Sequence, residues 1–291
     1  MKKILVTGCN GQLGRAIQRE YGDSAELLRT DVIEGDGIRS LDITNVAQVL
    51  ELVRAEKPDV IINCAAATNV DGCETNTDFA YRVNAIGPRN LAIASAETGA
   101  KLIHISTDYV FPGNAPRPLT EFDAPGPISA YGRTKYAGER FVQQFATRWF
   151  ILRTAWLYGD GKNFVRTMLR LSETHDEISV VCDQFGSPTA ASELARMIHY
   201  LEPTENYGIF HATCEGSTNW AEFTEEIFRL AGKATRVNHV TSQQYKEMNP
   251  NSADRPHYSI LDNYMLRLTC DFQMADWKDA IAAYMREERR A

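Results

Sequence analysis

A chain of 291 residues, 44% hydrophobic and 24% charged, has the composition of an ordinary globular protein and can bury a large core. The formal net charge of −7 argues against nucleic acid or an anionic membrane surface as the main partner. No apolar run approaches the length of a membrane span, and the first one breaks at Gly8, too early for a signal peptide.

The six cysteines and six histidines are scattered along the chain. The sequence has no Cys-x-x-Cys pair and no cluster of His and Cys with the spacing of zinc ligands. We therefore expect reduced thiols, a cytoplasmic location and no metal site.

The N-terminal segment has the pattern of a dinucleotide-binding turn. Residues 3–7 are apolar and β-branched, which predicts a buried parallel strand, and apolar residues at helical spacing over 13–21 predict a helix. Gly8, Gly11 and Gly14 form a Gly-x-x-Gly-x-x-Gly turn between the two. Glycines permit a tight turn and let the backbone approach a pyrophosphate, which then faces the free N–H groups of the helix start.

An acidic residue ends the second predicted strand. Residues 26–31 end in Asp31, at about the position where an acidic side chain accepts hydrogen bonds from the adenosine ribose. A carboxylate there would repel a 2′-phosphate and favours NAD(H), but Arg29 and Arg39 are near enough in sequence to weaken that preference. The alternative interpretation of Asp31 is a turn residue without a ligand.

Strands and helices continue to alternate as far as residue 203. Predicted strands lie at 59–63, 101–106, 149–153 and 178–181, and predicted helices at about 45–56, 80–96, 131–145, 163–173 and 191–200. Gly87 and Pro88 interrupt one of these helices and predict a kink. Small residues over 64–68 follow a strand and leave room for a ligand against the backbone, although close helix–strand packing is the other interpretation.

Beyond residue 203 the alternation weakens. The predicted elements there are a strand at 208–212, a helix at 219–230, a strand at 236–240 and a helix at 277–286. The whole pattern predicts an α/β fold, a doubly wound parallel sheet of the Rossmann type with a smaller C-terminal α/β substrate lobe. We expect the dinucleotide-binding domain to comprise 1–170 and about 187–203, and the substrate lobe to comprise 171–186 and 204–291.

Tyr131 and Lys135 lie four residues apart on a predicted helix, so their side chains share one face. A phenol with its ordinary pKa of about 10 is a poor acid at neutral pH, and a nearby ammonium lowers that pKa. Thr107 follows the preceding strand, where its hydroxyl can hold a substrate oxygen beside the phenol. A Tyr-x-x-x-Lys pair alone is more often an unreactive surface pair, so the prediction depends on this context.

The glycine turn, the small residues after a strand, the strand-end threonine and Tyr-x-x-x-Lys on the next helix occur in one order. In this combination the chain resembles the extended short-chain dehydrogenase/reductase superfamily and, within it, the dTDP-4-dehydrorhamnose reductase family. The segments that carry the resemblance span nearly the whole chain and are 11–14, 63–71, 106–111, 131–135, 153–159, 183–189, 255–256, Ser259 and Leu261.

The resemblance implies roles for particular residues. The catalytic residues that it implies are Thr107, Tyr131 and Lys135. The cofactor-binding residues that it implies are Gly8, Gly11, Gln12, Leu13, Gly14, Asp31, Asp42, Ile43, Ala65, Ala66, Ala67, Thr68, Tyr131 and Lys135. The substrate-binding residues that it implies are Thr107, Asp108, Trp156 and Arg255. The family often has a histidine where this chain has Ala67, so a backbone contact would persist there and a side-chain role would be lost.

Some of these residues have a second interpretation. Trp156 fits a core position as well as a sugar contact, because aromatic residues are mostly buried. Arg255 fits a solvated position as well as a contact with the substrate diphosphate. Arg166 is a further candidate for that diphosphate.

The activity implied by the resemblance is reduction of the C4 ketone of dTDP-4-dehydro-L-rhamnose to dTDP-L-rhamnose by hydride transfer from NADPH or NADH. We expect a monomer or a homodimer with a sugar nucleotide as its small-molecule partner. Two alternatives stay open. The regulatory subunit of methionine adenosyltransferase resembles the same family and acts as a binding partner. The second alternative is a related sugar-nucleotide epimerase or dehydratase. A dehydratase needs an Asp-Glu pair, whereas this chain has Asp108 and Tyr109 at that place.

Overall fold

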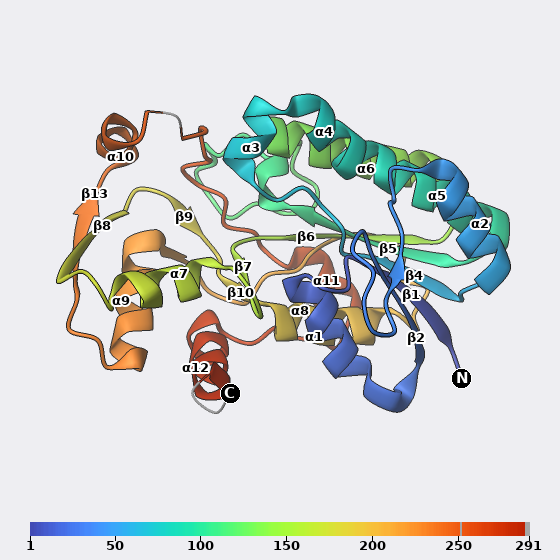
Figure 1. The fold of residues 1–291 in the computed structure, drawn as a ribbon. Coiled ribbons are helices and arrows are strands. Elements are labelled where there is room, and N and C mark those ends of the chain that lie inside the picture. Colours follow the sequence, from blue (N-terminus) through green and yellow to red (C-terminus); the bar gives the residue numbers. More distant parts are fainter. Residues whose placement is uncertain (251, 289–291) are drawn as a thin grey trace.

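A seven-stranded parallel sheet lies at the centre of the structure, a computed structural model that describes residues 1–250 and 252–288 (Figure 1). The strand order is β11-β6-β5-β4-β1-β2-β3, and the described pairings are all parallel. The strands are β1 (Lys3–Thr7), β2 (Glu26–Asp31), β3 (Arg39–Ser40), β4 (Val60–Asn63), β5 (Lys101–Thr107), β6 (Trp149–Thr154) and β11 (Gly208–His211). The order reverses at β1, so the carboxyl ends of β1 and β4 border the crevice where such folds bind ligands.

Helices cover both faces of this sheet (Figure 1). The helices on one face are α1 (Gln12–Tyr21), α8 (Ala191–Leu201) and α11 (Tyr264–Thr269), and those on the other are α2 (Val46–Glu56), α5 (Gly87–Thr98) and α6 (Ala130–Phe145). The side chains between the sheet and α1, α8 and α11 form the first core, and Ile4 and Val6 of β1 pack into it. Leu5 points the other way, into the core between the sheet and α2, α5 and α6. Because both faces are covered, the inner strands are apolar throughout, which is why they read as short buried runs in the sequence.

The helix predicted over 80–96 is interrupted near Gly87 and Pro88. The interruption takes the form of a π-helical turn. The order of elements is α4 (Thr77–Tyr81), the π turn (Arg82–Ile86) and then α5. Proline cannot donate the next helical N–H bond, which favours a widened turn ahead of it. The turn brings the carbonyl of Asn84 against α6, where Gly138 makes room, since a β-carbon on Gly138 would lie 2.2 Å from that oxygen.

A separate, smaller core lies beside the sheet, at the left in Figure 1. Its elements are α7 (Phe164–Leu171), β8 (Glu177–Val181), α9 (Trp220–Ala231), β13 (Arg236–Val240) and α12 (Trp277–Glu288). The strands β8 and β13 pair in parallel, and α9 packs against both of them and against α7 and α12. Phe223, Ile227 and Trp277 are buried in this core.

The remaining elements are short. They are α3 (Val70–Thr75), β7 (Leu157–Tyr158), β9 (Phe185–Gly186), β10 (Thr189–Ala190), β12 (Thr218–Asn219), α10 (Ser242–Met248) and the 3-10 turns Gly22–Ser24 and Asp108–Val110. Within the part of the chain that the structure describes, none of the helices has the length and apolar character needed to cross a membrane.

The predicted doubly wound sheet with a smaller α/β unit beside it is confirmed. Two elements lie elsewhere than we expected. The strand β11, predicted in the lobe, pairs with β6 at the edge of the central sheet, and α7, predicted in the dinucleotide-binding domain, packs in the smaller core. A local pattern indicates that an element exists, whereas contacts between distant residues decide which layer it joins. The division into domains at the boundaries given above stays a prediction.

Candidate active site

The carboxyl ends of β1, β4, β5 and β6 border a cleft of about 570 Å³. The predicted site residues that line it are Gly11, Gln12, Leu13, Gly14, Ala65, Ala66, Thr68, Thr107, Asp108, Tyr131, Lys135, Trp156 and Arg255. The predicted residues outside this lining are Gly8, Asp31, Asp42, Ile43 and Ala67. The fold thus brings together segments from residue 11 to residue 255 in one place.

The packing of the backbone requires glycines in the turn after β1. Gly8 has φ +61°, and a β-carbon there would lie 2.8 Å from the backbone nitrogen of Ala65. A β-carbon on Gly14 would lie 2.4 Å from the carbonyl oxygen of Gly8. The turn therefore holds the start of α1 directly against the strand ends that border the cleft.

The first turn of α1 fits the diphosphate of a dinucleotide. Its N-cap is Gly11, which offers no side-chain hydrogen bond, whereas α2, α6, α7 and α9 are capped by Asn or Ser side chains. Gln12, Leu13 and Gly14 begin the helix and line the cleft, and the buried Oε1 of Gln12 has no hydrogen-bond partner among the described residues. Free N–H groups and the helix dipole favour an anion at such a position. The residues present fit a nicotinamide dinucleotide.

Asp31 lies beside the glycine turn at the end of β2. Its Oδ2 accepts a hydrogen bond of 3.0 Å from the backbone N–H of Asn10, and its Oδ1 accepts one of 2.8 Å from that of Val32. The carboxylate is therefore anchored at the edge of the turn, where a ribose contact is predicted, although it does not line the cleft. Arg39, one of the two nearby arginines, is ion-paired with Glu56.

Asp42 and Ile43, predicted near the adenine, lie in the turn before α2. Oδ1 of Asp42 accepts a hydrogen bond of 2.9 Å from the backbone N–H of Thr44. The side chain of Ile43 is buried in the core, close against Gly87. An adenine could therefore reach only the backbone of Ile43, and both roles stay predictions.

Lys135 is buried at the base of the cleft. Its Nζ donates a hydrogen bond of 2.5 Å to the carbonyl oxygen of Ile105 on β5. Burial lowers the pKa of Lys135 to about 8, and the carboxylate of Glu139, one helical turn away, opposes that fall. The ammonium therefore titrates close to neutrality and is mostly charged at pH 7.

Tyr131 lines the cleft one turn before Lys135 on α6. Its ring packs edge-on against Tyr109, with ring centroids 5.4 Å apart. We expected Lys135 to lower the pKa of the phenol, but the larger effect is burial, which raises it, while the Thr107 hydroxyl lowers it. The phenol is consequently protonated at neutral pH, which is the form that a proton donor requires.

Thr107 ends β5 beside this phenol. Its hydroxyl donates a hydrogen bond of 3.0 Å to Oδ1 of Asp108 and accepts one of 3.2 Å from the backbone N–H of Tyr109. Burial raises the pKa of Asp108 to about 6, against the opposing effect of the hydroxyls of Ser259 and Thr107. The site therefore holds a protonated phenol, a hydroxyl and a carboxyl group with a nearly neutral pKa in one cleft.

Asn84 in the π turn fixes the loop after β4, and the sequence analysis did not single it out. Its Oδ1 accepts a hydrogen bond of 2.8 Å from the N–H of Ala67, and its Nδ2 donates to the Ala67 carbonyl at 3.0 Å and to the Thr134 hydroxyl at 3.1 Å. Ala67 and Tyr131 both pack against the small buried cluster of Cys73, Ala80 and Ala130. An asparagine within a helical pattern gives no sign of this contact with a distant loop.

Trp156 and Trp220 form a stacked pair in the cleft wall. Their ring centroids are 3.5 Å apart and their planes are inclined by 9°. Trp156 has φ +49°, which is uncommon for a bulky residue, and a β-carbon on Gly186 would lie 2.6 Å from its Cε2. Trp156 is therefore partly packed and partly open to the cleft. Trp220 begins α9 in the smaller core, and no spacing in the sequence links it to Trp156.

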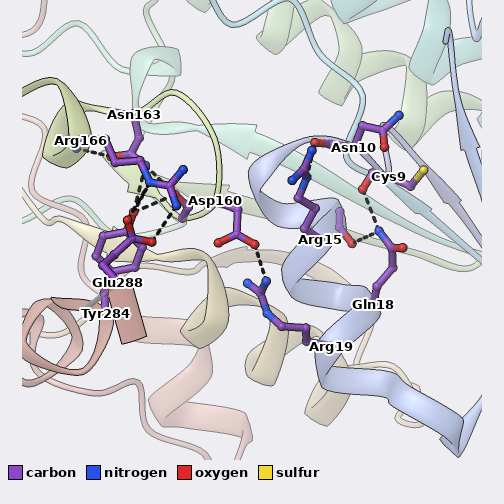
Figure 2. A network of polar contacts seen from close by, with 12 residues as sticks. Cys9, Asn10, Arg15, Gln18, Arg19, Asp160, Asn163, Arg166, Tyr284 and Glu288 are labelled. Carbon is purple, nitrogen blue, oxygen red and sulfur yellow. Dashed lines mark hydrogen bonds and ion pairs between the residues drawn. The ribbon is translucent and has the colours of Figure 1, made fainter. Parts of the chain in front are cut away.

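Arg255 lines the cleft, whereas Arg166 does not. One guanidinium nitrogen of Arg255 lies 3.7 Å from Oδ2 of Asp71. Arg166 pairs with Glu288 at 2.7 Å and donates to the Tyr284 hydroxyl at 3.2 Å, which joins α7 to α12 (Figure 2). The structure therefore does not bring Arg166 to the site, because its charge is used within the smaller core.

The loop after β7 also borders the cleft, and the sequence analysis missed it. Asp160, Gly161 and Lys162 line the end of the cleft that the glycine turn forms. Asp160 makes an ion pair with Arg19 of α1, as Figure 2 shows. This pair ties the loop to the helix that starts at the glycine turn.

The doubly wound fold, the glycine turn and the grouping of Thr107, Tyr131 and Lys135 define a class, the extended short-chain dehydrogenases/reductases. The family model described as "RmlD substrate binding domain" matches residues 1–290. The chain belongs to this family. The dTDP-4-dehydrorhamnose reductase of Escherichia coli (strain K12) is 37% identical to it over 98% of this chain and 97% of that protein.

Solved structures agree with this assignment. A dTDP-4-dehydrorhamnose reductase from Clostridium acetobutylicum ATCC 824 is 49% identical and superposes with a TM-score of 0.93, covering 99% of both chains. A dTDP-4-dehydrorhamnose reductase from Bacillus anthracis str. Ames, solved in complex with NADP, is 43% identical with a TM-score of 0.91, again over 99% of both chains.

Proposed function

We propose that this protein reduces the C4 ketone of dTDP-4-dehydro-L-rhamnose to dTDP-L-rhamnose, with NADPH or NADH as the hydride donor. The observation that carries the proposal is the meeting of Thr107, Tyr131 and Lys135 in the cleft that begins at the glycine turn. The full-length similarity to named dTDP-4-dehydrorhamnose reductases supports the choice of substrate.

When bound, a reduced nicotinamide would supply the hydride for the ketone carbon. Tyr131 donates its proton to the ketone oxygen, where negative charge develops, and the hydroxyl of Thr107 turns from Oδ1 of Asp108 to donate a hydrogen bond to that oxygen. Lys135 keeps a positive charge beneath the phenol and stabilises the phenolate that remains. Burial raises the pKa of Tyr131 and so makes it a weaker acid, and the Thr107 hydroxyl, which lowers that pKa, offsets part of this effect.

The same cleft would hold the sugar nucleotide. Asp108 and the indole of Trp156 line it and would make polar and stacking contacts, and the guanidinium of Arg255 suits a diphosphate. Since Arg255 now lies near Asp71, substrate binding would exchange one anionic partner for another.

The oligomeric state and the location belong to the same proposal. We propose a monomer or a homodimer, and Thr107, Tyr131 and Lys135 of one chain line one cleft. A cytoplasmic location fits the six free cysteines of the structure.

A substrate panel tests the function. Purified protein is mixed with NADPH or NADH and with dTDP- or UDP-linked 4-keto-6-deoxy sugars, and loss of the reduced-nicotinamide absorbance is followed. We expect consumption that depends on the dTDP-linked 4-keto-6-deoxy sugar and oxidised cofactor that leaves the protein after each turnover. Tight copurification of NAD without net consumption would point to an epimerase instead.

A further inference from the structure

Behind the cleft, contacts from three segments meet at one buried carboxylate. Glu139 lies on α6, one turn after Lys135, and is fully buried. Its Oε1 accepts hydrogen bonds from the Ser106 hydroxyl at 2.5 Å and from Nε of Arg153 at 2.9 Å, and its Oε2 accepts one from Nη2 of Arg153 at 2.7 Å. Both oxygens of the carboxylate are therefore hydrogen-bonded within the protein.

These contacts link three segments that border the cleft: the end of β5, the end of β6 and the helix α6. Ser106 adjoins Thr107 at the end of β5, and Arg153 lies near the end of β6, just before the cleft-lining residues 154–156. The helix that carries the carboxylate also carries the phenol and the lysine. Two aligned hydrogen bonds between a guanidinium and a carboxylate fix both distance and orientation, so the three segments are held in one register.

Stability alone gives no reason for this arrangement. Glu139 and Arg153 are both almost completely buried, and Nη1 of Arg153 has no hydrogen-bond partner among the described residues. The guanidinium lies over the ring of Phe111, 5.1 Å from its centroid. Buried ion pairs can often be replaced by apolar residues with no loss of stability, because removing two charges from water is costly.

The charge of the carboxylate also acts on the lysine. The groups that act on Lys135 are Glu139 on its own helix, Cys64 after β4, and His104 and the Ile105 carbonyl on β5. Behind Glu139 lies the cation of Arg153, which is bonded to its carboxylate. Burial raises the pKa of Cys64 and lowers that of His104, so both are neutral at pH 7, as is the phenol. Among these groups, Glu139 is the anion that opposes the loss of the lysine proton.

We propose that Glu139 is a positioning residue of this active site, which through its bonds to Ser106 and Arg153 holds Thr107 and the end of β6 in register with the helix of Tyr131 and Lys135. The kinetic part of the test depends on the proposed reductase function, but the charge of Lys135 can be measured without cofactor or substrate.

The test uses two variants and a matched control. Glu139→Gln removes the anion, and Glu139→Gln/Arg153→Met removes the anion without leaving its buried cation unpaired. The control is Glu202→Gln at the other end of the sheet, since Glu202 is also a buried carboxylate and lies 2.8 Å from the ammonium of Lys2. The control reports the effect of losing a buried charge far from the cleft.

The first readout is the pH titration of Lys135 itself, followed by the NMR signal of its Cε carbon in cofactor-free protein and assigned with Lys135→Arg. We expect the midpoint to fall by about one pH unit in Glu139→Gln, to fall by less in the double variant, which also removes the cation of Arg153, and to stay in place in Glu202→Gln. The basic limb of the pH profile of kcat should move in the same direction. An unchanged midpoint in Glu139→Gln would overturn the charge role, whatever reaction the protein catalyses.

A third variant, Ser106→Ala, separates positioning from charge, because it removes only the contact with β5. We expect kcat to fall about tenfold while the Lys135 midpoint stays in place, as displacement of a reacting group by a fraction of an ångström slows proton transfer. A kcat equal to that of the wild type would overturn the positioning role of the Glu139–Ser106 contact.

Discussion

Burial displaces the pKa values of Lys135 and Asp108 toward neutrality from opposite sides, to about 8 and about 6. In both cases removal from water disfavours the charged form. Such groups exchange protons near neutral pH, and their gathering in one cleft is typical of catalytic sites. Their residue types were evident in the sequence, but the sizes of the shifts depend on burial, which the sequence does not specify.

Asp108→Asn should stabilise the protein at neutral pH. The raised pKa means that the folded state binds this proton more tightly than the unfolded chain, so stability from this group falls as the pH rises from about 4 to about 6. We expect the variant to gain about 2 kcal/mol in the free energy of unfolding at pH 7 and almost nothing at pH 4, measured by urea unfolding. Activity should fall, since Asp108 lines the cleft.

Asp123→Asn is the control of opposite sign. The Arg117 guanidinium lowers the pKa of Asp123, so the stability it contributes is present at neutral pH and is lost as the pH falls through the lowered pKa. Asp123→Asn should therefore destabilise the protein at pH 7. Equal effects of the two substitutions at pH 7 would contradict the assignment of Asp108 as a group penalised by burial.

At the scale of elements, the sequence identified those that have a local cause. The glycine turn, the buried strands and the helix of Tyr131 follow from glycine chemistry and apolar periodicity, and all three are confirmed. The contact of Asn84 with the 64–68 loop and the Trp156–Trp220 stack have no local cause, because each joins residues that only the folded chain brings together.

Asn84→Ala should release the loop after β4. The substitution leaves the N–H and carbonyl of Ala67 without their partner, so we expect a loss of about 2 kcal/mol in the free energy of unfolding and weaker NADPH binding. The matched control is Thr241→Ala, which removes the N-cap of α10 in the smaller unit and should cost about 1 kcal/mol without affecting NADPH binding. Urea unfolding and fluorescence titration measure both quantities, and equal NADPH affinities of the two variants would contradict the role of Asn84.

At the scale of the whole molecule, the chain returns to the central sheet after residue 203. Phe210 of β11 and Leu266 of α11 are buried in the core beneath β1 and α1. The boundary that we predicted at 204 therefore cuts through this core. The weakening alternation of strands and helices indicated a change of structure there, but an edge strand and a lobe strand look alike in a sequence.

A chain that ends at residue 203 should not fold stably. It lacks the edge strand β11 and the side chains of Phe210, Leu266 and Met274, each of which packs in the first core. Loss of large buried side chains costs about 2 to 5 kcal/mol each, so the three losses together are comparable to the whole stability of a typical domain. Circular dichroism during urea unfolding should show no cooperative transition, and a transition with the midpoint of the full chain would contradict this view of the fold.

The measurement that tests the central claim most directly is the turnover of Tyr131→Phe with NADPH and dTDP-4-dehydro-L-rhamnose. The substitution removes one hydroxyl from the cleft and leaves the ring against Tyr109. We predict that kcat falls at least about 100-fold, while the Kd for NADPH, measured by fluorescence titration, stays within about twofold of the wild-type value. A kcat equal to that of the wild type would contradict the account, because the proton would then have to come from another group.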